Sequence, residues 1–202
     1  MLRRLGLVLT LAGATLVAFA GARIAEAGMA RERVRAAWDA ASARRAIQLA
    51  ANSLAGHAAD AAAYGAPVGR LIIPALGLDE VVIEGVGGEE LRAGPGHLPG
   101  SVLPGEAGNA VISAHRDRHF HALDQLAIGD SIQTITGQNN VTWVVVGRRV
   151  VASGEPALFA AGTPTLTLTT CWPVRYLGPT PDRLVVIAVQ ADTPAVIART
   201  GE

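Results

Sequence analysis

From residue 66 onward, glycine and proline divide the sequence into seven short runs that are rich in strand-forming residues. The runs cover residues 69–73, 81–86, 109–114, 131–136, 141–151, 165–170 and 183–191. Short strands separated by turn residues are typical of an all-β barrel or sandwich. We therefore predict one all-β domain over residues 66–202, and this pattern restricts the fold more than any other feature of the chain.

The N-terminus is apolar instead of turn-rich. Residues 5–22 carry no charge, and residues 3–4 before them are both arginine. A membrane-spanning helix needs roughly 17–25 apolar residues, so we predict a membrane anchor over residues 1–25. A cleaved signal peptide is an alternative, because small-residue patterns occur at 20–22 and 25–27. A buried core helix is a weaker alternative, because nothing strongly polar interrupts the stretch.

Residues 26–65 join this segment to the β domain. Alanine and arginine, which both favour helix, dominate residues 29–63. Val34, Trp38 and Ala41 lie on one face at helical spacing, so we predict a juxtamembrane helix or linker. A very short N-terminal tail usually stays in the cytoplasm, although arginines after the anchor oppose this orientation. We expect a single-pass protein of the cell membrane with its β domain outside the cytoplasm.

The charge balance disfavours nucleic acid as a partner. The chain has 17 basic and 17 acidic residues, and every basic residue is arginine. Acidic residues outnumber arginines after residue 66, so a groove that follows phosphates is not expected. The sequence has one cysteine, which excludes an internal disulfide.

That cysteine, Cys171, ends the strand-like run TLTLTT, and Trp172-Pro173 follows it. Proline cannot continue a ladder of hydrogen bonds, so the thiol is predicted where a strand opens into a loop. Scaffolds often present reactive groups at such places. A lone cysteine can equally be a small buried hydrophobe, and the residues alone leave both possibilities open.

A reactive thiol needs a proton partner and a nearby cation. His115 follows the run 109–114 just as Cys171 follows its own run, whereas His97 lies in a turn-rich loop, GPGHLPGS. Arg183, which begins the last run, is a candidate for the cation, and Arg175 is the alternative candidate.

Several neighbours of His115 have alternative roles. Asp117 could orient His115 or cap a turn. Phe120 and Leu123 are expected to anchor the turn, with His119 and His121 on its exposed side. His115 and His119 could form a zinc pair at x3 spacing, but no third ligand is evident.

Four motifs, taken in order, resemble the sortases, a family of membrane-anchored cysteine transpeptidases. They are GPGHLPGS, GNAVISAHRDRHF, TLTLTTC and PDRLVVIA, and the resemblance covers roughly residues 66–192. It is greatest to class D sortases and to the related group found in Gram-negative bacteria, where the domain would be periplasmic. The resemblance implies an eight-stranded sortase-type β-barrel and carries over three catalytic residues, His115, Cys171 and Arg183.

The resemblance also implies a reaction and two partners. A sortase cleaves an LPXTG-like sorting signal of a surface protein through a thioacyl-enzyme and transfers the acyl group to an amine acceptor. No cofactor and no metal are predicted, because the acidic residues do not form a dense cluster of oxygen ligands. We expect the apolar substrate side chains to lie against the segment between Val151 and Thr163, which includes Ala157, Leu158 and Phe159.

Two alternatives remain open from the sequence. A cysteine peptidase on the same scaffold would use the same residues and let water resolve the acyl-enzyme. A non-catalytic, membrane-tethered β-barrel binding module would carry a structural cysteine. A redox sensor is less favoured, because one thiol without a resolving partner is a poor switch.

Overall fold

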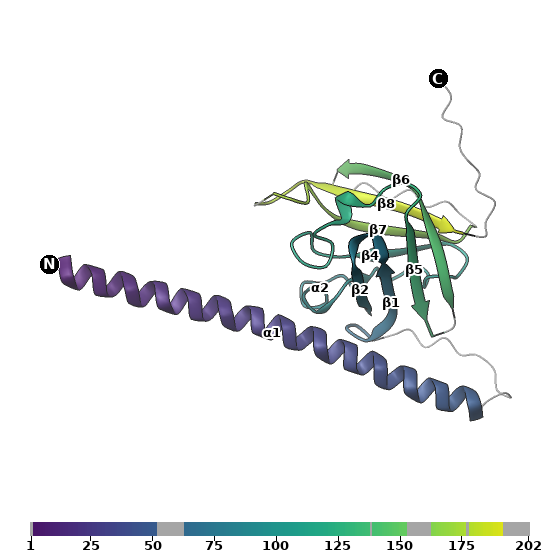
Figure 1. The fold of residues 1–202 in the computed structure, drawn as a ribbon, viewed down its shortest axis with the longest axis horizontal. Helices are drawn as coiled ribbons and strands as arrows, with labels where there is room; N and C mark the ends of the chain where they lie inside the picture. The colour runs from purple at the N-terminus through teal and green to yellow at the C-terminus, as the bar shows by residue number, and fades with distance from the viewer. Residues whose placement is uncertain (1, 52–62, 138, 153–162, 177, 192–202) are drawn as a thin grey trace, which may run out of the picture.

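The computed structural model describes residues 2–51, 63–137, 139–152, 163–176 and 178–191. Figure 1 shows one long helix, α1, beside a β-barrel, with the N-terminal half of the helix projecting well beyond the barrel. α1 spans Leu2–Ala51 without a break. At 1.5 Å per residue its 50 residues extend over about 75 Å.

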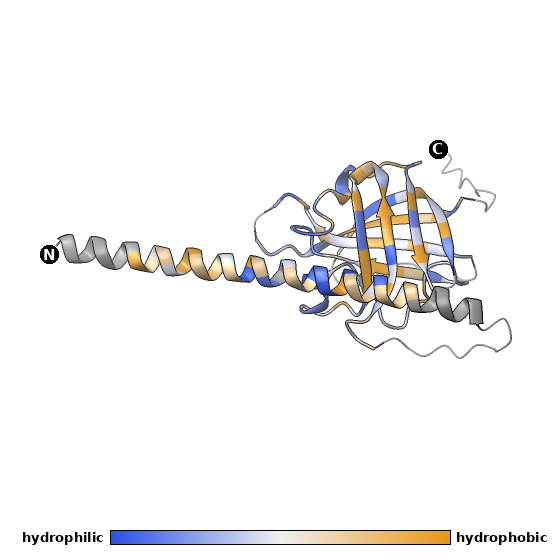
Figure 2. Cartoon of the chain, turned by 60° about the horizontal axis from the view of Figure 1, so that its bottom comes forward, coloured by the Kyte–Doolittle hydropathy of each residue, from blue (hydrophilic) through white to orange (hydrophobic). Residues whose placement is uncertain are grey.

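The projecting half of α1 is the apolar part of the helix. In the coloured part of this half, Figure 2 shows mostly hydrophobic residues, and it shows hydrophilic residues where the helix reaches the barrel. Its large apolar side chains are exposed, among them Leu11, Leu16, Val17 and Phe19. The helix is long and apolar enough to cross a membrane, as the sequence predicts for this segment.

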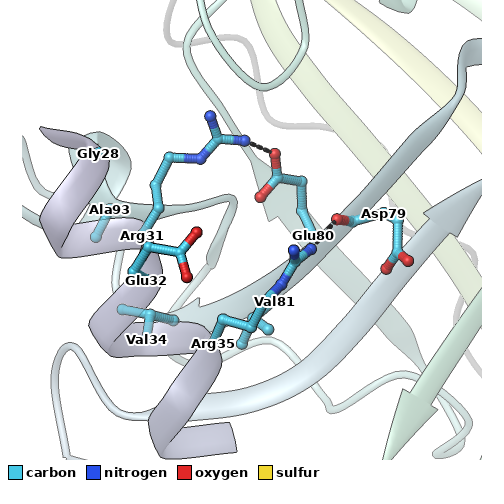
Figure 3. Close-up of a pocket in the computed structure, with 9 residues that line it drawn as sticks. All are labelled: Gly28, Arg31, Glu32, Val34, Arg35, Asp79, Glu80, Val81 and Ala93. Atoms are coloured by element: carbon cyan, nitrogen blue, oxygen red, sulfur yellow. Dashed lines mark hydrogen bonds and ion pairs between the residues drawn. The ribbon is translucent and has the colours of Figure 1, made fainter. Parts of the chain in front are cut away.

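The next part of α1 packs against the barrel. Arg31 forms an ion pair with Glu80, and Arg35 donates a hydrogen bond to the carbonyl oxygen of Asp79 at 2.9 Å. These contacts cross a cavity of about 260 Å³ between α1 and the barrel (Figure 3). Trp38, one turn further along, is buried. Both ionic and apolar contacts therefore hold α1 on the barrel.

Eight strands close the barrel in the order β1-β2-β3-β4-β7-β8-β6-β5. Their bounds are β1 Pro67–Ile73, β2 Leu78–Glu84, β3 Gly96–His97, β4 Asn109–Ser113, β5 Ser131–Thr136, β6 Asn140–Ala152, β7 Thr165–Trp172 and β8 Asp182–Gln190. Three short helices lie between strands: η1 Pro74–Leu76, α2 Glu90–Ala93 and η2 Leu123–Gln125. The predicted all-β, eight-stranded barrel is confirmed, and each of the seven predicted runs contains most of one strand.

The barrel interior is filled by alternate residues of its strands. Ile112, Leu168, Val186 and Trp143 belong to one buried apolar cluster. Trp143 keeps its indole N–H satisfied by donating to Thr134 Oγ1 at 2.8 Å. Since side chains alternate between the two faces of a strand, the residues next to these core positions point outward. That alternation decides where the candidate site lies.

β3 is the strand that the sequence analysis did not find. His97 was expected in a loop, but it lies in β3, where Gly96 and His97 pair with both β2 and β4. A two-residue strand beside proline and glycine has no periodic pattern that could reveal it. The pairing buries His97 and closes the barrel between β2 and β4.

Candidate active site

The register of three neighbouring strands places His115, Cys171 and Arg183 side by side. β4 and β7 are parallel and pair up to Ser113 and Thr169. His115 lies two residues beyond the first of these and Cys171 two residues beyond the second. β7 and β8 are antiparallel, and Cys171 pairs directly with Arg183. Residues that are directly paired across strands project from the same face of the sheet.

That face is the outside of the barrel. In β7, Leu166 and Leu168 belong to the buried core, and in β8, Leu184 and Val186 do. Cys171 lies an odd number of residues from the core leucines of its strand, so its side chain points away from the barrel interior. The thiol is half-buried and therefore reachable from solvent.

All three side chains line one pocket of about 220 Å³. Arg183 Nη1 donates a hydrogen bond to Cys171 Sγ. The remaining lining residues are Val86, Leu91, Ser113, Ala114, Thr169 and Thr170. The pocket therefore combines a thiol, an imidazole and a guanidinium with an apolar wall.

Two hydrogen bonds hold the ends of β4 and β7 together next to the pocket. The N–H of Ala114 donates to the carbonyl oxygen of Thr169 at 3.1 Å. Thr170 Oγ1 donates to the carbonyl oxygen of Ala114 at 2.7 Å, and this hydroxyl is buried. These bonds extend the pairing of the two strands to the residues directly before His115 and Cys171.

The environment of His115 favours the neutral imidazole. Partial burial lowers the pKa of His115 below its usual value near 6.5. The negative charge of Asp117 opposes this effect, while Arg118, His119 and Arg92 add to it. A neutral histidine beside a thiol can exchange a proton with it, which is the first requirement of general acid–base chemistry.

The other candidate residues, Arg175 and Asp117, do not line this pocket. The side chain of Arg175 is 70% exposed and lies 3.9 Å from Asp124, so the structure does not bring it into the pocket. Asp117 is exposed, and its influence on His115 is electrostatic. Arg183, whose position opposite Cys171 is fixed by the strand pairing, is the arginine next to the thiol.

The turn after His115 differs in one respect from the expectation. Phe120 and Leu123 are fully buried and anchor the turn, as expected. His121 is exposed, but His119 is buried, with its Nδ1 3.4 Å from Glu80 Oε1. Glu80 is the acidic side chain next to the buried ring, but neither ring nitrogen of His119 makes a hydrogen bond to a described residue.

The zinc pair is not supported by the described part of the chain. Among those residues, no three histidine, cysteine or acidic side chains converge in a group that could hold a metal ion. The side chain of His119 lies against β2 instead of beside His115. An x3 spacing is therefore compatible here with two histidines that face different partners.

His97, Glu84 and Ser101 resemble a second set of catalytic groups, but their contacts are all within the fold. His97 Nδ1 lies 2.7 Å from Glu84 Oε2, and Nε2 lies 3.0 Å from the carbonyl oxygen of Val102. Ser101 Oγ donates to the carbonyl oxygen of Leu98 at 2.8 Å and lies 2.9 Å from Nε2. Both ring nitrogens and the Ser101 hydroxyl therefore already have partners within the fold, which gives this network a structural role.

Sequence reasoning missed the apolar wall of the pocket. Val86 follows β2 and Leu91 lies in α2, far in sequence from both His115 and Cys171. No local pattern indicates that these residues reach the site. The predicted substrate segment between Val151 and Thr163 cannot be compared, because residues 153–162, including Ala157, Leu158 and Phe159, lie outside the described residues.

Fold and site together define a class: a closed β-barrel with a thiol, an imidazole and a guanidinium in one solvent-open pocket on its outer face. A family model for the sortase domain matches residues 71–191. Sortase D of Bacillus subtilis (strain 168) is 30% identical over 124 residues, which cover 60% of this chain and 63% of that protein.

Two solved structures have a similar fold. A Clostridium perfringens Sortase D5 transpeptidase has a TM-score of 0.62 at 21% identity, over 81% of this chain and 96% of that one. Sortase C from Clostridium perfringens SM101 has a TM-score of 0.58 at 27% identity, over 65% and 73% of the two chains. The chain belongs to the sortase family, which confirms the resemblance read from its motifs.

Proposed function

We propose that this protein is a membrane-anchored cysteine transpeptidase that cleaves an LPXTG-like sorting signal and transfers the acyl fragment to an amine acceptor. One observation carries the proposal: Arg183 hydrogen-bonds the sulfur of Cys171 in a pocket that His115 also lines. Cys171 is the nucleophile, His115 the general acid and base, and Arg183 the cation that stabilises the oxyanion. Neither a metal nor a cofactor takes part in the proposed steps.

The first half of the reaction forms a thioacyl-enzyme. The thiol of Cys171 passes its proton to His115, and Sγ attacks the carbonyl carbon of the Thr–Gly bond. A C–S bond forms, and the carbonyl electron pair moves to oxygen, where Arg183 and a backbone N–H stabilise the charge. The oxyanion then collapses, the C–N bond breaks, and His115 protonates the leaving amine.

The second half restores the enzyme. The amine of the acceptor attacks the thioester carbon, and His115 removes a proton from that amine. The new C–N bond forms as the C–S bond breaks, and Cys171 leaves as the thiolate and regains its proton from His115. Proton transfer of this kind contributes roughly 100- to 10,000-fold to the rate.

The apolar wall of the pocket suits a sorting signal. Val86, which follows β2, and Leu91 of α2 line the pocket together with Cys171 of β7. Leucine and proline side chains of the substrate can pack against this wall. The scissile carbonyl carbon would then lie next to the sulfur of Cys171. We propose this wall, together with the segment between Val151 and Thr163, as the binding surface for the signal.

We propose that α1 anchors the protein with its N-terminus in the cytoplasm and the barrel outside. Residues 1–25 would be the anchor, 26–65 the juxtamembrane segment and 66–202 the catalytic domain, in the periplasm if the cell is Gram-negative. α2 lies between the juxtamembrane part of α1 and the site, because Ala93 lines the cavity that Gly28 also lines and Leu91 lines the active-site pocket. Gly28 lies three residues beyond the end of the anchor, or about 4.5 Å along the helix, so the site would operate close to the membrane.

The test uses the full chain in detergent micelles with a labelled LPXTG-like peptide, with and without triglycine. We expect a thioacyl adduct on Cys171 by mass spectrometry and an amide product that contains triglycine. Cys171→Ala should abolish both, and Arg175→Ala, an exposed arginine outside the pocket, should not. A product that is always the free acid would identify a peptidase, and an unprocessed peptide with both proteins would leave only a binding module.

A further inference from the structure

Arg116, the residue directly after His115, makes an unusual set of contacts. Its Nη1 donates to the carbonyl oxygen of Pro173 at 3.0 Å and to Thr180 Oγ1 at 3.1 Å. Its Nη2 donates to the carbonyl oxygen of Gly178. The guanidinium also lies 5.9 Å from the centre of the Tyr176 ring, within the range of a cation–π interaction.

All four partners belong to the connection between β7 and β8. Pro173 lies two residues after Cys171, and Thr180 lies three residues before Arg183. One guanidinium therefore holds both ends of the connection that separates the nucleophile from the oxyanion-binding arginine. Arg116 also directly follows His115, the general acid and base, in the sequence.

The geometry indicates a role in position and not in the chemistry. Arg116 does not line the active-site pocket, and its hydrogen-bond partners are two carbonyl oxygens and a hydroxyl. Such neutral acceptors need donors at defined angles, which the planar fork of arginine supplies and the single ammonium of lysine does not. The contacts therefore favour a geometric function over a simple charge effect.

The opposite side of the same turn is already fixed. The N–H of Phe120 donates to the carbonyl oxygen of His115 at 3.1 Å, and Phe120 is fully buried in the core. This bond secures the backbone of His115 from inside the barrel. Arg116 supplies the second attachment, on the outside, toward the strands that carry the sulfur.

We propose that Arg116 is a positioning residue that holds His115 against Cys171 and Arg183 by fastening the turn after β4 to the β7–β8 connection. This inference rests on the proposed transpeptidase function. Without Arg116, the imidazole and the sulfur would still be present but would no longer be held at a fixed separation. A displacement of about 1 Å can reduce the rate by roughly 100-fold.

The kinetic test compares Arg116→Ala, Arg116→Lys and Thr180→Val with wild-type full chain in micelles. We expect Arg116→Ala to lower kcat by up to about 100-fold with little change in KM, because Arg116 does not contact the pocket. Lysine should restore only part of kcat. Thr180→Val should cause a smaller loss, and adding it to Arg116→Ala should cause almost no further loss, because the two residues share one interaction. Arg175→Ala, in the same connection, is the matched control.

A second measurement does not depend on turnover. The charged or titratable groups around His115 are Asp117, Arg118 and His119 on its own turn, Arg92 on α2, and Cys171 and Arg183 in the pocket. Burial lowers the pKa of His115, so release of the turn should raise it toward 6.5. NMR titration of histidine-labelled protein, assigned with His115→Gln, should show this upward shift in Arg116→Ala and not in Arg175→Ala.

The outcomes distinguish failure of the proposed transpeptidase function from failure of the positioning role of Arg116. If wild-type protein forms no thioacyl adduct, the proposed function fails, and the titration still decides the role of Arg116. If Arg116→Ala keeps kcat within about twofold and leaves the His115 titration unchanged, Arg116 does not position His115. If that variant does not fold, Thr180→Val and Arg116→Lys provide the same comparison, and wild-type behaviour in both would overturn the inference.

Discussion

Replacing Arg183 tests the chemistry of the pocket most directly. Arg183 pairs with Cys171 across β7 and β8, and its Nη1 hydrogen-bonds the sulfur. A guanidinium has five N–H donors, so others remain for the oxygen of the scissile carbonyl. Alanine removes both the charge and the donors, whereas lysine keeps the charge and loses the fork.

The size of the effect follows from the role of a single oxyanion donor. Loss of one such donor typically costs about 100- to 1,000-fold in kcat, or roughly 2.7–4 kcal/mol. Arg183 is half-buried in a solvent-open pocket, so water partly replaces it, and we expect the lower end, about 100-fold, for Arg183→Ala. If lysine retains about half of that stabilisation, Arg183→Lys should lose about tenfold.

Steady-state kinetics on the LPXTG-like peptide, with triglycine as acceptor, measures both variants against Arg175→Ala. KM should change little, because the apolar wall does not include Arg183. The melting temperature should also stay close to that of wild type, because Arg183 projects from the outer face and surface substitutions usually change stability by less than about 0.5 kcal/mol. Activity of Arg183→Ala within about threefold of wild type, or lysine equal to arginine, would refute the oxyanion role.

Two further substitutions have expected directions. Asp117→Asn removes the charge that raises the pKa of His115, so the NMR midpoint of His115 and the limb of the pH–rate profile that it governs should both move to lower pH; an upward shift would contradict the electrostatic account. Glu84→Gln replaces a carboxylate that is 13% exposed and bonded to buried His97, so it should destabilise the fold by about 1.5–3 kcal/mol in chemical denaturation. A change of less than about 0.5 kcal/mol in the free energy of unfolding would show that the Glu84–His97 pair behaves like a solvated surface pair. That result would contradict the prediction.

The low pKa of His115 also has a consequence for stability. A histidine whose pKa is lower in the folded state than in the unfolded state binds fewer protons when folded. Stability therefore rises with pH through the interval between the two values, and it falls as the pH drops below about 6.5. Acid should weaken the fold and the site through the same residue.

Local sequence patterns predicted the parts of the fold that depend on local structure. Seven strands have the alternation or β propensity that marks them, and strand ends at His115 and Cys171 could be located from the residues that follow. Parallel pairing of β4 with β7 then brings two equivalent strand ends together. The choice of Arg183 over Arg175 needed the family resemblance, because only the pairing of β7 with β8 shows which arginine lies opposite the thiol.

The parts that the sequence did not predict depend on tertiary contacts. β3 is defined by its pairing with β2 and β4 and not by any periodicity. Leu91 reaches the pocket only because α2 lies beside β2 and α1. The buried His119 lies next to Glu80, which is distant in sequence. Each of these features is set by a neighbour on another element, which single-sequence patterns cannot reveal.

The alternation of side chains explains how one scaffold can combine a dense core with a reactive site. Leu168 and Val186 fill the barrel, while Cys171 and Arg183 belong to the outward set of the same two strands. A substitution of an outward residue therefore removes chemistry and leaves the core intact. A change at Thr170 would be different, because its buried hydroxyl donates to the carbonyl oxygen of Ala114. Losing that bond would leave a buried acceptor unpaired, at a cost of about 1–3 kcal/mol. Stability and reactivity are therefore separable at Cys171 and Arg183 and coupled at the residue between the core and the thiol.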